Sequence, residues 1–410
     1  MLKRSFLQAE RWESLGKPLI QDETDGLSRA KRPRTLPDTR IIQRSSEVPP
    51  VQKALIIDSF ENEMTLREDV DVPLELDDYD ILVKNSYVGL NHFDWKTKKY
   101  KFCIYSFPWI NGRESSGVVV KLGKKVSTKD FPLNCKVFLA STSYRNIQTS
   151  TFQEYTVFDS RLVWKVPSTV PVLDVEERTK YSPGFDLSAF AGTGVSLVTA
   201  GCSLSYFLDF DNLTSLNGNK KCLVIWGGST SIGHFLIQLA KYSNAFEKII
   251  AVAGLQSTAH LKTLGADEVI DRFETEDNII EKLLETCSNK VEYAIDLASK
   301  DSAKILMKVM QKSVQASEKK IVCVSGTPSD EDSYDGIAVE TINIKKFHEN
   351  IEFGKSFVRY TSELFGEKKL KLQRNIKLID DKDSFDDRIK RGLKDLEEQK
   401  YKGTKIVVKI

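Results

Sequence analysis

Hydrophobic and polar residues alternate along much of the chain between residues 51 and 186. Successive side chains of a β-strand point to opposite faces, so a period of two predicts strands. Gly123 and residues 130–134 interrupt the pattern, and we expect turns there. The alternating segments are KALIIDS, DDYDILVKNSYVGLN, SSGVVVKLG, CKVFLAS and FQEYTVFD. Residues 51–186 are therefore predicted to form the first part of a β-rich domain.

The pattern changes after about residue 186. Short apolar runs (CLVIW, IIAVA, DEVI, EYAID and KIVCVS) alternate with stretches typical of helices. The expected helices begin at Ile232 and lie near 256–264, 276–287 and 301–312. Alternation of strands and helices predicts a parallel sheet covered on both faces. We expect a doubly wound α/β domain over residues 187–354, with residues 355–410 returning to the first domain.

Composition narrows the classes of protein to which the chain can belong. The 410 residues carry 60 Lys and Arg against 58 Asp and Glu, a formal net charge of +2. This balance argues against a dedicated nucleic-acid binder, which needs a surplus of basic residues. No apolar run approaches the roughly 20 residues that cross a bilayer. The six cysteines form no C-x-x-C pair, so we expect a reducing compartment, the cytoplasm.

The first fifty residues differ from the rest. They contain five of the twelve prolines and carry a net charge of +3. We interpret residues 1–50 as a flexible basic extension. A nuclear signal around RAKRPR and a peripheral contact with an anionic membrane are the alternatives.

A glycine-rich turn follows the predicted strand CLVIW. In a dinucleotide-binding unit the glycines of such a turn allow a tight bend, approach of the pyrophosphate, and close packing of the next helix. Here Gly228, Thr230 and Gly233 hold these three places, and the helix N-terminus would offer N–H groups to the phosphates. The alternative is a turn that binds nothing. The residues predicted to contact the cofactor are Gly228, Ser229, Thr230, Ser231, Ile232 and Gly233.

The segment after the second strand of this unit bears on the choice of cofactor. An acidic residue at this place binds the ribose 2′-hydroxyl of NAD. Residues 254–258, which follow the predicted strand 249–253, contain no carboxylate. NADPH is therefore preferred over NADH, although no arginine replaces the carboxylate. The side chains left to contact a 2′-phosphate are Ser257, Thr258 and Lys262.

Further motifs extend the picture to the whole of residues 51–410. They are VGLNHFDWK (88–96), FPWINGRESSGVVVKLGKKV (107–126), SLVTAG (196–201), LGADEVID (264–271), VEYAID (291–296), VCVSG (322–326) and the closing GTKIVVKI. In these motifs the chain resembles the medium-chain dehydrogenase/reductase superfamily, and more closely its zinc-free quinone-oxidoreductase-like and fungal enoyl-reductase-like branches. The resemblance implies a GroES-like β domain interrupted by a Rossmann domain. It leaves open whether the protein forms a homodimer.

The same resemblance implies a set of site residues. The zinc-ligand positions of the metal-dependent relatives look like Asn91, Arg113 and Val195, none of which supplies a thiolate or imidazole, so we expect no catalytic zinc. The resemblance places Asn91 at the cofactor, together with Ser325 and Gly326 near the nicotinamide. The residues expected to act in catalysis are Lys96, Tyr100 and Thr199.

Two functions are compatible with these features. The first is an NADPH-dependent, zinc-independent oxidoreductase that transfers hydride to a small-molecule substrate, namely an activated alkene, a quinone or an aldehyde. The alternative is a non-catalytic, reductase-like protein that binds membranes peripherally and assists traffic of a plasma-membrane proton pump, as is described for some fungal members of the superfamily. The basic extension and the altered glycine turn favour the alternative.

Overall fold

The computed structural model describes residues 48–142, 145–167, 185–210, 221–329, 334–401 and 403–410. The segment for which a membrane or nuclear role is an expectation, residues 1–47 of the basic extension, lies outside the described residues. Within the described part, no helix is both long enough and apolar enough to cross a bilayer.

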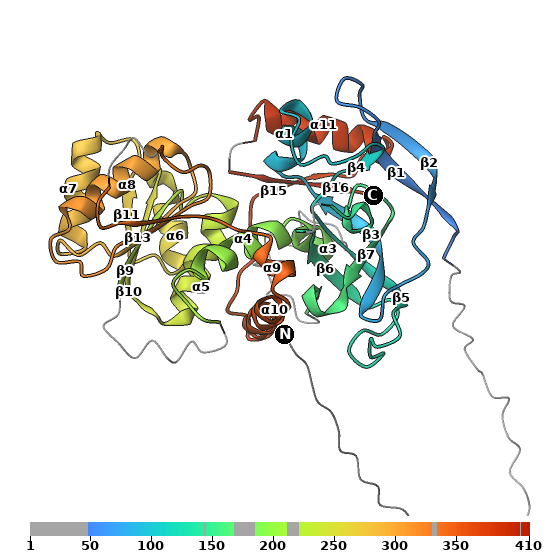
Figure 1. Cartoon of the computed structure of the whole chain (residues 1–410), viewed down its shortest axis with the longest axis horizontal. Helices are drawn as coiled ribbons and strands as arrows, with labels where there is room; N and C mark the ends of the chain where they lie inside the picture. Colours follow the sequence, from blue (N-terminus) through green and yellow to red (C-terminus); the bar gives the residue numbers. More distant parts are fainter. Residues whose placement is uncertain (1–47, 143–144, 168–184, 211–220, 330–333, 402) are drawn as a thin grey trace, which may run out of the picture. The chain divides into compact units, whose positions relative to one another are not determined.

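Residues 48–167 and the C-terminal segment build two β-sheets (Figure 1). One sheet has the order β2-β1-β4, and the other has the order β15-β16-β3-β5-β6-β8, with β7 also pairing with β3. The strands are β1 Val51–Ile57, β2 Thr65–Asp71, β3 Asp80–Gly89, β4 Trp109–Ile110, β5 Glu114–Leu122, β6 Lys136–Ala140, β7 Tyr155–Asp159, β8 Trp164–Lys165, β15 Ile376–Ile379 and β16 Lys405–Lys409. Two helices accompany them, α1 His92–Lys99 and α11 Phe385–Glu397.

The last strand of the chain lies inside this β domain. β16 pairs antiparallel with β3, with Val407 opposite Gly89. β15 pairs parallel with β16 on its other side. Residues 376–409 therefore complete a sheet whose other strands all come from the first 165 residues of the chain.

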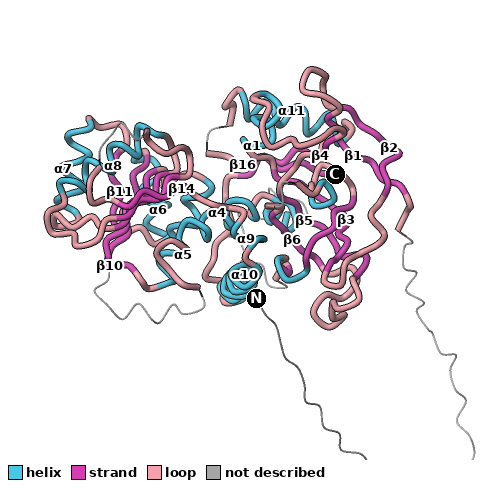
Figure 2. Tube along the Cα trace, viewed as in Figure 1, coloured by secondary structure: helices cyan, strands magenta, loops and turns pink. Residues whose placement is uncertain are grey.

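The middle of the chain forms a six-stranded parallel sheet of order β11-β10-β9-β12-β13-β14. Its strands are β9 Lys221–Trp226, β10 Phe246–Ala253, β11 Glu268–Asp271, β12 Tyr293–Asp296, β13 Lys320–Cys323 and β14 Ala338–Thr341. The helices that follow strands of this sheet are α5 Ser231–Ser243, α6 Thr258–Leu264, α7 Glu276–Thr286 and α8 Lys300–Lys312. Figure 2 shows helices on both faces of these strands. The predicted fold class, a GroES-like β domain interrupted by a doubly wound parallel sheet, is confirmed.

Burial explains why the strands of this sheet read as continuous apolar runs. Leu223 and Ile225 of β9 belong to one core cluster, whereas Val224 and Trp226 belong to another. Alternate side chains thus fill cores on opposite faces of the sheet, as expected for a parallel sheet covered by helices. The helix expected over 256–264 differs slightly, because its first turn is a 3-10 helix and α6 begins only at Thr258.

Among the described residues, four further helices accompany these three sheets: α3 Phe185–Ala191, α4 Gly194–Leu204, α9 Lys346–Glu349 and α10 Ile351–Gly366. Aromatic stacking ties α9 to the β domain. The Trp164 ring of β8 stacks on Phe138 of β6 at 5.1 Å and on Phe347 of α9 at 5.5 Å between centroids. All three rings are fully buried, so this stack is a continuous part of the main core.

Candidate functional site

The turn between β9 and α5 is built on closely packed glycines. Gly227 has a φ of +90°, a conformation that favours glycine. A Cβ on Gly233 would lie 2.5 Å from the carbonyl oxygen of Gly228, so only glycine lets α5 pack this closely against the turn. A Cβ on Gly228 would lie 2.8 Å from Cβ of Ala251 on β10. Gly233 has the close packing that the sequence predicts for it, whereas the positive φ of the turn lies at Gly227, one residue before the predicted Gly228.

Thr230 occupies the place where the pattern prefers glycine, and its side chain has a local role. It is the N-cap of α5, and its hydroxyl oxygen accepts a hydrogen bond from the backbone N–H of Gly233 at 3.0 Å. This cap satisfies the third N–H of the helix. The N–H groups of Ser231 and Ile232, the first two residues of α5, have no acceptor among the described residues. These two donors fit a pyrophosphate group.

The loops after β12 and β13 lie beside this turn. The backbone N–H of Leu297 donates to the carbonyl of Trp226 at 3.0 Å, and the Ser325 hydroxyl donates to the carbonyl of Leu297 at 2.8 Å. Gly326 follows with a φ of +125°. The structure thus brings the predicted residues Ser325 and Gly326 to the glycine turn through Leu297.

Asp296, the last residue of β12, stabilises the loop between β12 and α8. It is fully buried, and it accepts hydrogen bonds from the Ser302 hydroxyl at 2.5 Å and from the backbone N–H of Ser299 at 3.1 Å. Burial raises its pKa to about 6. Its contacts hold the first turn of α8, which accounts for the residue in structural terms.

Sequence reasoning missed an arginine whose backbone lies beside the end of β10. The backbone N–H of Arg272 donates to the carbonyl of Ala253, the last residue of β10, at 3.0 Å. Arg272 is exposed, and its guanidinium lies 4.2 Å from the centroid of the Phe273 ring. The sequence could have revealed this arginine. β11 runs parallel to β10, so the residue that follows the last residue of β11 lies beside the end of β10.

The structure separates the three residues predicted to read the ribose. Ser257 and Thr258 lie at the start of α6, close to the end of β10 in sequence. The Thr258 hydroxyl is buried and has no hydrogen-bond partner among the described residues. Lys262 instead forms an ion pair with Glu268 at 3.3 Å. Glu268 is the first residue of β11, so this pair lies at the opposite end of the strand from Asp271.

A buried ion pair occupies the region of the zinc-ligand positions. The Lys405 ammonium of β16 pairs with the Glu114 carboxylate of β5, and it also donates to Oδ1 of Asn91 at 2.7 Å. The Asn91 amide nitrogen donates to Oε1 of Glu114 at 3.0 Å. The backbone N–H of Val195 on α4 donates to Oε2 of Glu114 at 2.8 Å. Glu114 is fully buried and 7% of the Lys405 side chain is exposed.

The packing around this network leaves no space for a larger group. A Cβ on Gly89 would lie 2.5 Å from Oε1 of Glu114, and a Cβ on Gly192 would lie 2.7 Å from Cγ of Lys405. Asn91 is thus held by the ion pair, and its side chain has both its donor and its acceptor used. Within the described residues, no group of three or more His, Cys, Asp or Glu side chains is placed to hold a metal ion.

Asp94 lies one turn away on α1 and is nearly completely buried. Its Oδ2 accepts a hydrogen bond from the backbone N–H of Asn91 at 2.8 Å, while its Oδ1 has no partner among the described residues. Burial raises the pKa of Asp94 to about 7, against the opposing effects of that hydrogen bond and of the positive charge of Arg113. Asp94 therefore titrates near neutral pH.

The three residues predicted to act in catalysis have different environments. Lys96 and Tyr100 are exposed and flank the same ring, with the Lys96 ammonium 5.6 Å and the Tyr100 ring 6.1 Å from the Trp95 ring centroid. Thr199 is buried in α4, and its hydroxyl donates to the carbonyl of Val195 at 2.7 Å. Lys96 and Tyr100 are available to a ligand, and the roles of all three residues stay predictions.

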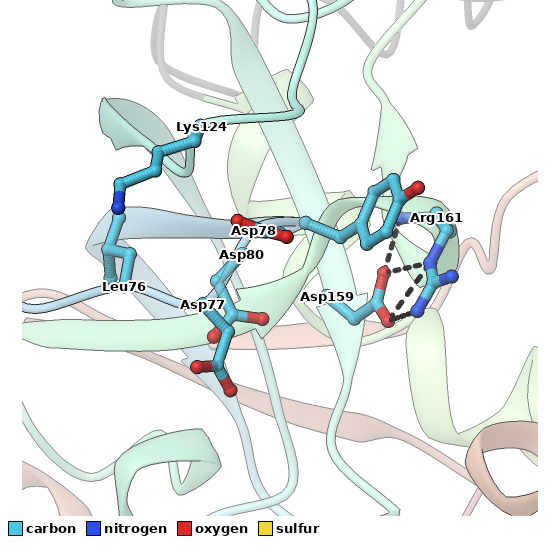
Figure 3. A pocket seen from close by; sticks show the side chains of 8 residues that line it. Leu76, Asp77, Asp78, Asp80, Lys124, Asp159 and Arg161 are labelled. Carbon is cyan, nitrogen blue, oxygen red and sulfur yellow. Dashed lines mark hydrogen bonds and ion pairs between the residues drawn. The ribbon is translucent and has the colours of Figure 1, made fainter.

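A cavity of about 550 Å³ opens elsewhere, in the β domain (Figure 3). Arg161 forms hydrogen bonds with the Asp159 carboxylate at its edge, and burial raises the pKa of Asp80 within it. None of the predicted site residues lines this cavity, so it is separate from the nucleotide turn. Its lining residues are Leu76, Asp77, Asp78, Tyr79, Asp80, Lys124, Asp159 and Arg161.

Two family models match the chain in the order of its domains. Residues 77–168 match the alcohol dehydrogenase GroES-like domain, and residues 231–337 match the zinc-binding dehydrogenase model. The first match covers strands β3 to β8, and the second covers α5 to the residue before β14.

Curated and solved proteins agree with these matches. An uncharacterized protein of Saccharomyces cerevisiae is 32% identical over 260 residues, 62% of this chain and 67% of that protein. The trans-enoyl reductase himH of Aspergillus japonicus is 28% identical over 194 residues, 47% of this chain and 52% of that protein. The structure of a quinone oxidoreductase from Pseudomonas syringae pv. tomato DC3000 matches with a TM-score of 0.64 at 17% identity, covering 88% of this chain and all of that one. This chain thus spans about two thirds of the yeast relative and about half of the enoyl reductase.

The buried ion pair leads to a stability prediction. Lys405→Met leaves the Glu114 carboxylate buried without its cation, and breaking such a pair costs about 3–5 kcal/mol of unfolding free energy. Combining it with Glu114→Gln removes both charges, so we expect the double variant to be more stable than the sum of the single effects. Urea unfolding measures the three values, with Lys409→Met on the same strand as an exposed control. Additive single effects would contradict an energetic link between the two residues.

The raised pKa of Asp94 leads to a second prediction. A carboxyl that titrates near 3.9 when unfolded and near 7 when folded takes up a proton on folding between these values. Its contribution to stability is therefore present at low pH and is lost as pH rises towards 7, by up to ~1.4 kcal/mol per pH unit. Asp94→Asn should gain stability relative to wild type between pH 5 and pH 8, whereas exposed Asp130→Asn should not. Parallel pH curves for Asp94→Asn and wild type would refute the assignment.

Proposed function

The chain belongs to the medium-chain dehydrogenase/reductase superfamily of oxidoreductases, and on this premise we propose that it is an NADPH-dependent, zinc-independent reductase. Its substrates would be compounds with an activated carbon–carbon double bond, with quinones and reactive aldehydes as further acceptors. The observation that carries the proposal is the open end of α5, where two backbone N–H groups follow a glycine turn and have no acceptor within the described residues.

The residues of this turn fit a dinucleotide. The N–H groups of Ser231 and Ile232 would hold the pyrophosphate, and Ser325 and Gly326 line the carboxyl edge of the sheet where ligands of such folds bind. Arg272, at the end of β10, would contribute positive charge to the 2′-phosphate of NADPH. When bound, NADPH supplies the hydride. The protein's task is then to orient the nicotinamide and the acceptor and to complete protonation.

Zinc independence rests on the chemistry of the side chains. An amide, a guanidinium and an apolar side chain stand at the positions of Asn91, Arg113 and Val195, and none of them is a zinc ligand of the usual kind. The Lys405 ammonium supplies a tethered cation to the carboxylate of Glu114 in this region. Negative charge that develops on an acceptor oxygen must then be stabilised by donors of the protein.

Two exposed donors support this task. The Lys96 ammonium and the Tyr100 ring both lie near the Trp95 ring. We propose the Lys96 ammonium and the Tyr100 hydroxyl as the groups that stabilise the acceptor oxygen and donate the proton. Exposed aromatic side chains in the same stretch of the chain would suit an apolar acceptor. They are Tyr100, Phe102, Tyr105 and Phe107, with exposed fractions of 61%, 39%, 45% and 43%. The names of the relatives, a trans-enoyl reductase and a quinone oxidoreductase, support the same class of acceptor.

The proposal predicts that a single backbone N–H matters for cofactor binding. Ser231→Pro removes this N–H at the first position of α5, where proline is well tolerated and the extended conformation of Thr230 accepts it. The helix should persist while NADPH affinity falls at least about tenfold, the effect of losing one hydrogen bond to a charged group. Isothermal titration calorimetry measures the affinity, and a thermal-shift series with NADPH and NADH reports the preferred cofactor.

The same replacement at the first residue of α7, Glu276→Pro, is the matched control, because its N-cap Thr275 is also extended. This control should leave NADPH binding unchanged. Absence of a thermal shift of the wild-type protein with either cofactor at millimolar concentration would refute the reductase function, since ligand at 100 times its Kd adds about 2.7 kcal/mol of stability.

A further inference from the structure

Residues 367–375 connect α10 to β15, and hydrogen bonds fix this connecting segment along α5. Leu370 of the segment is fully buried in the main core. Next to it, the carbonyl oxygen of Lys371 accepts hydrogen bonds from Nε2 of His234 at 2.8 Å and from the Gln238 amide at 3.1 Å. The backbone N–H of Lys371 donates in return to Oε1 of Gln238 at 2.7 Å. Three hydrogen bonds therefore hold the connecting segment against one helix.

The connecting segment also contacts α6 and the last strand of the chain. The Lys371 ammonium donates to the carbonyl of Thr263 on α6 at 3.1 Å. At the end of the segment, the carbonyl of Asn375 accepts a hydrogen bond from the backbone N–H of Lys405 at 2.9 Å. The side chain of the same lysine forms the buried ion pair with Glu114. The segment thus links the helices that follow β9 and β10 to the ion pair of the β domain.

Two imidazoles lie where the connecting segment meets these helices. His234 of α5 and His260 of α6 stack with ring centroids 5.6 Å apart and planes at 22°. His234 is buried, and the Phe235 ring packs edge-on against it with centroids 5.0 Å apart, whereas His260 is half-buried. Because the Lys371 carbonyl can only accept, Nε2 of His234 carries a hydrogen. The hydrogen bond to the segment is therefore compatible with an uncharged imidazole.

A positive charge on either imidazole would be poorly compensated. Among the described residues, neither ring forms an ion pair with a carboxylate. Burial lowers the pKa of His234 to about 4, and the positive charges of Arg374 and Lys371 oppose its protonation further. Burial and the same two cations also lower the pKa of His260. The other charged side chains in this region form exposed ion pairs with each other, Lys262 with Glu268 and Lys369 with Glu367.

We propose that the two stacked histidines form an acid-sensitive clasp: when the pair takes up a proton, residues 367–375 leave α5 and α6. In the closed state the proton enters a buried site among cations, whereas in the open state water solvates the imidazolium. A histidine of this kind favours the closed state above its ordinary pKa of 6.5 and loses that contribution as the pH falls towards 4. Release would free the backbone that holds Lys405, and it requires no bound cofactor.

Hydrogen–deuterium exchange of the full-length protein at pH 7 and pH 5 measures the release, once rates are corrected for the intrinsic pH dependence of exchange. The backbone N–H of Lys371 is the reporter, because it is bonded to Gln238. Its protection should fall at least about tenfold from pH 7 to pH 5, since one such histidine shifts the opening equilibrium by up to about tenfold per pH unit. Peptides of α8 should keep their protection, which would show that the protein stays folded.

A double variant tests whether the imidazoles cause the release. His234→Gln combined with His260→Gln removes both titrating groups and leaves an amide that can donate to the Lys371 carbonyl. The loss of protection between pH 7 and pH 5 should then disappear. His348→Gln is the matched control, because this half-buried imidazole on α9 is bonded to the Thr142 hydroxyl instead. The control should keep the wild-type fall in protection.

Three results would overturn the clasp. They are full protection of Lys371 at pH 5, loss of protection in α8 at the same pH, and the same fall in the double variant as in the wild-type protein. If the double variant is unfolded or unprotected at pH 7, a histidine NMR titration of the wild-type protein decides. Charging of His234 at the pH where Lys371 loses protection supports the clasp, whereas charging without that loss contradicts it.

Discussion

The ion pair between Glu114 and Lys405 is the interaction on which the rest of the β domain depends. Its members come from β5 and from β16, the last strand of the chain, and Asn91 after β3 and the start of α4 complete the network. A buried carboxylate is costly unless a cation and hydrogen-bond donors surround it. Here one ammonium, one amide and one backbone N–H satisfy Glu114. The network therefore joins the C-terminal strand to the region between β3 and α4.

This network also sets the chemistry that the region can offer. Metal-dependent relatives would place a divalent cation near these positions, whereas this chain places an internal ammonium there and closes the surrounding space with Gly89 and Gly192. A tethered cation that is already paired with a carboxylate has little free charge to give to a substrate. In the proposed reductase, stabilisation of an acceptor oxygen would then fall to exposed groups such as Lys96 and Tyr100. Burial raises the pKa of the nearby Asp94 to about 7.

The sequence allowed the elements of the fold to be predicted, because period and apolar runs are local properties. The alternation of CLVIW, IIAVA and later strands with helices was sufficient for the parallel sheet, and the glycine turn was found where strand and helix meet. Lys405 and Arg272 were not found, because their positions depend on how strands that are distant in the sequence pair with one another. Lys405 reads as an exposed residue at the start of an alternating strand, although in the structure it is buried and paired with Glu114. Arg272 reaches the end of β10 only through the parallel register of β10 with β11.

The altered glycine turn also shows what a sequence motif leaves out. A threonine in place of the middle glycine weakens the fingerprint when it is judged as a pattern of letters. In the folded chain Thr230 caps α5 through its own hydroxyl, and the two preceding N–H groups of the helix have no acceptor among the described residues. The departure therefore changes how the helix end is stabilised and leaves the two N–H groups on which the proposed phosphate site rests. A phosphate site is defined by which donors remain unsatisfied after folding, and this depends on hydrogen bonds that a motif does not record.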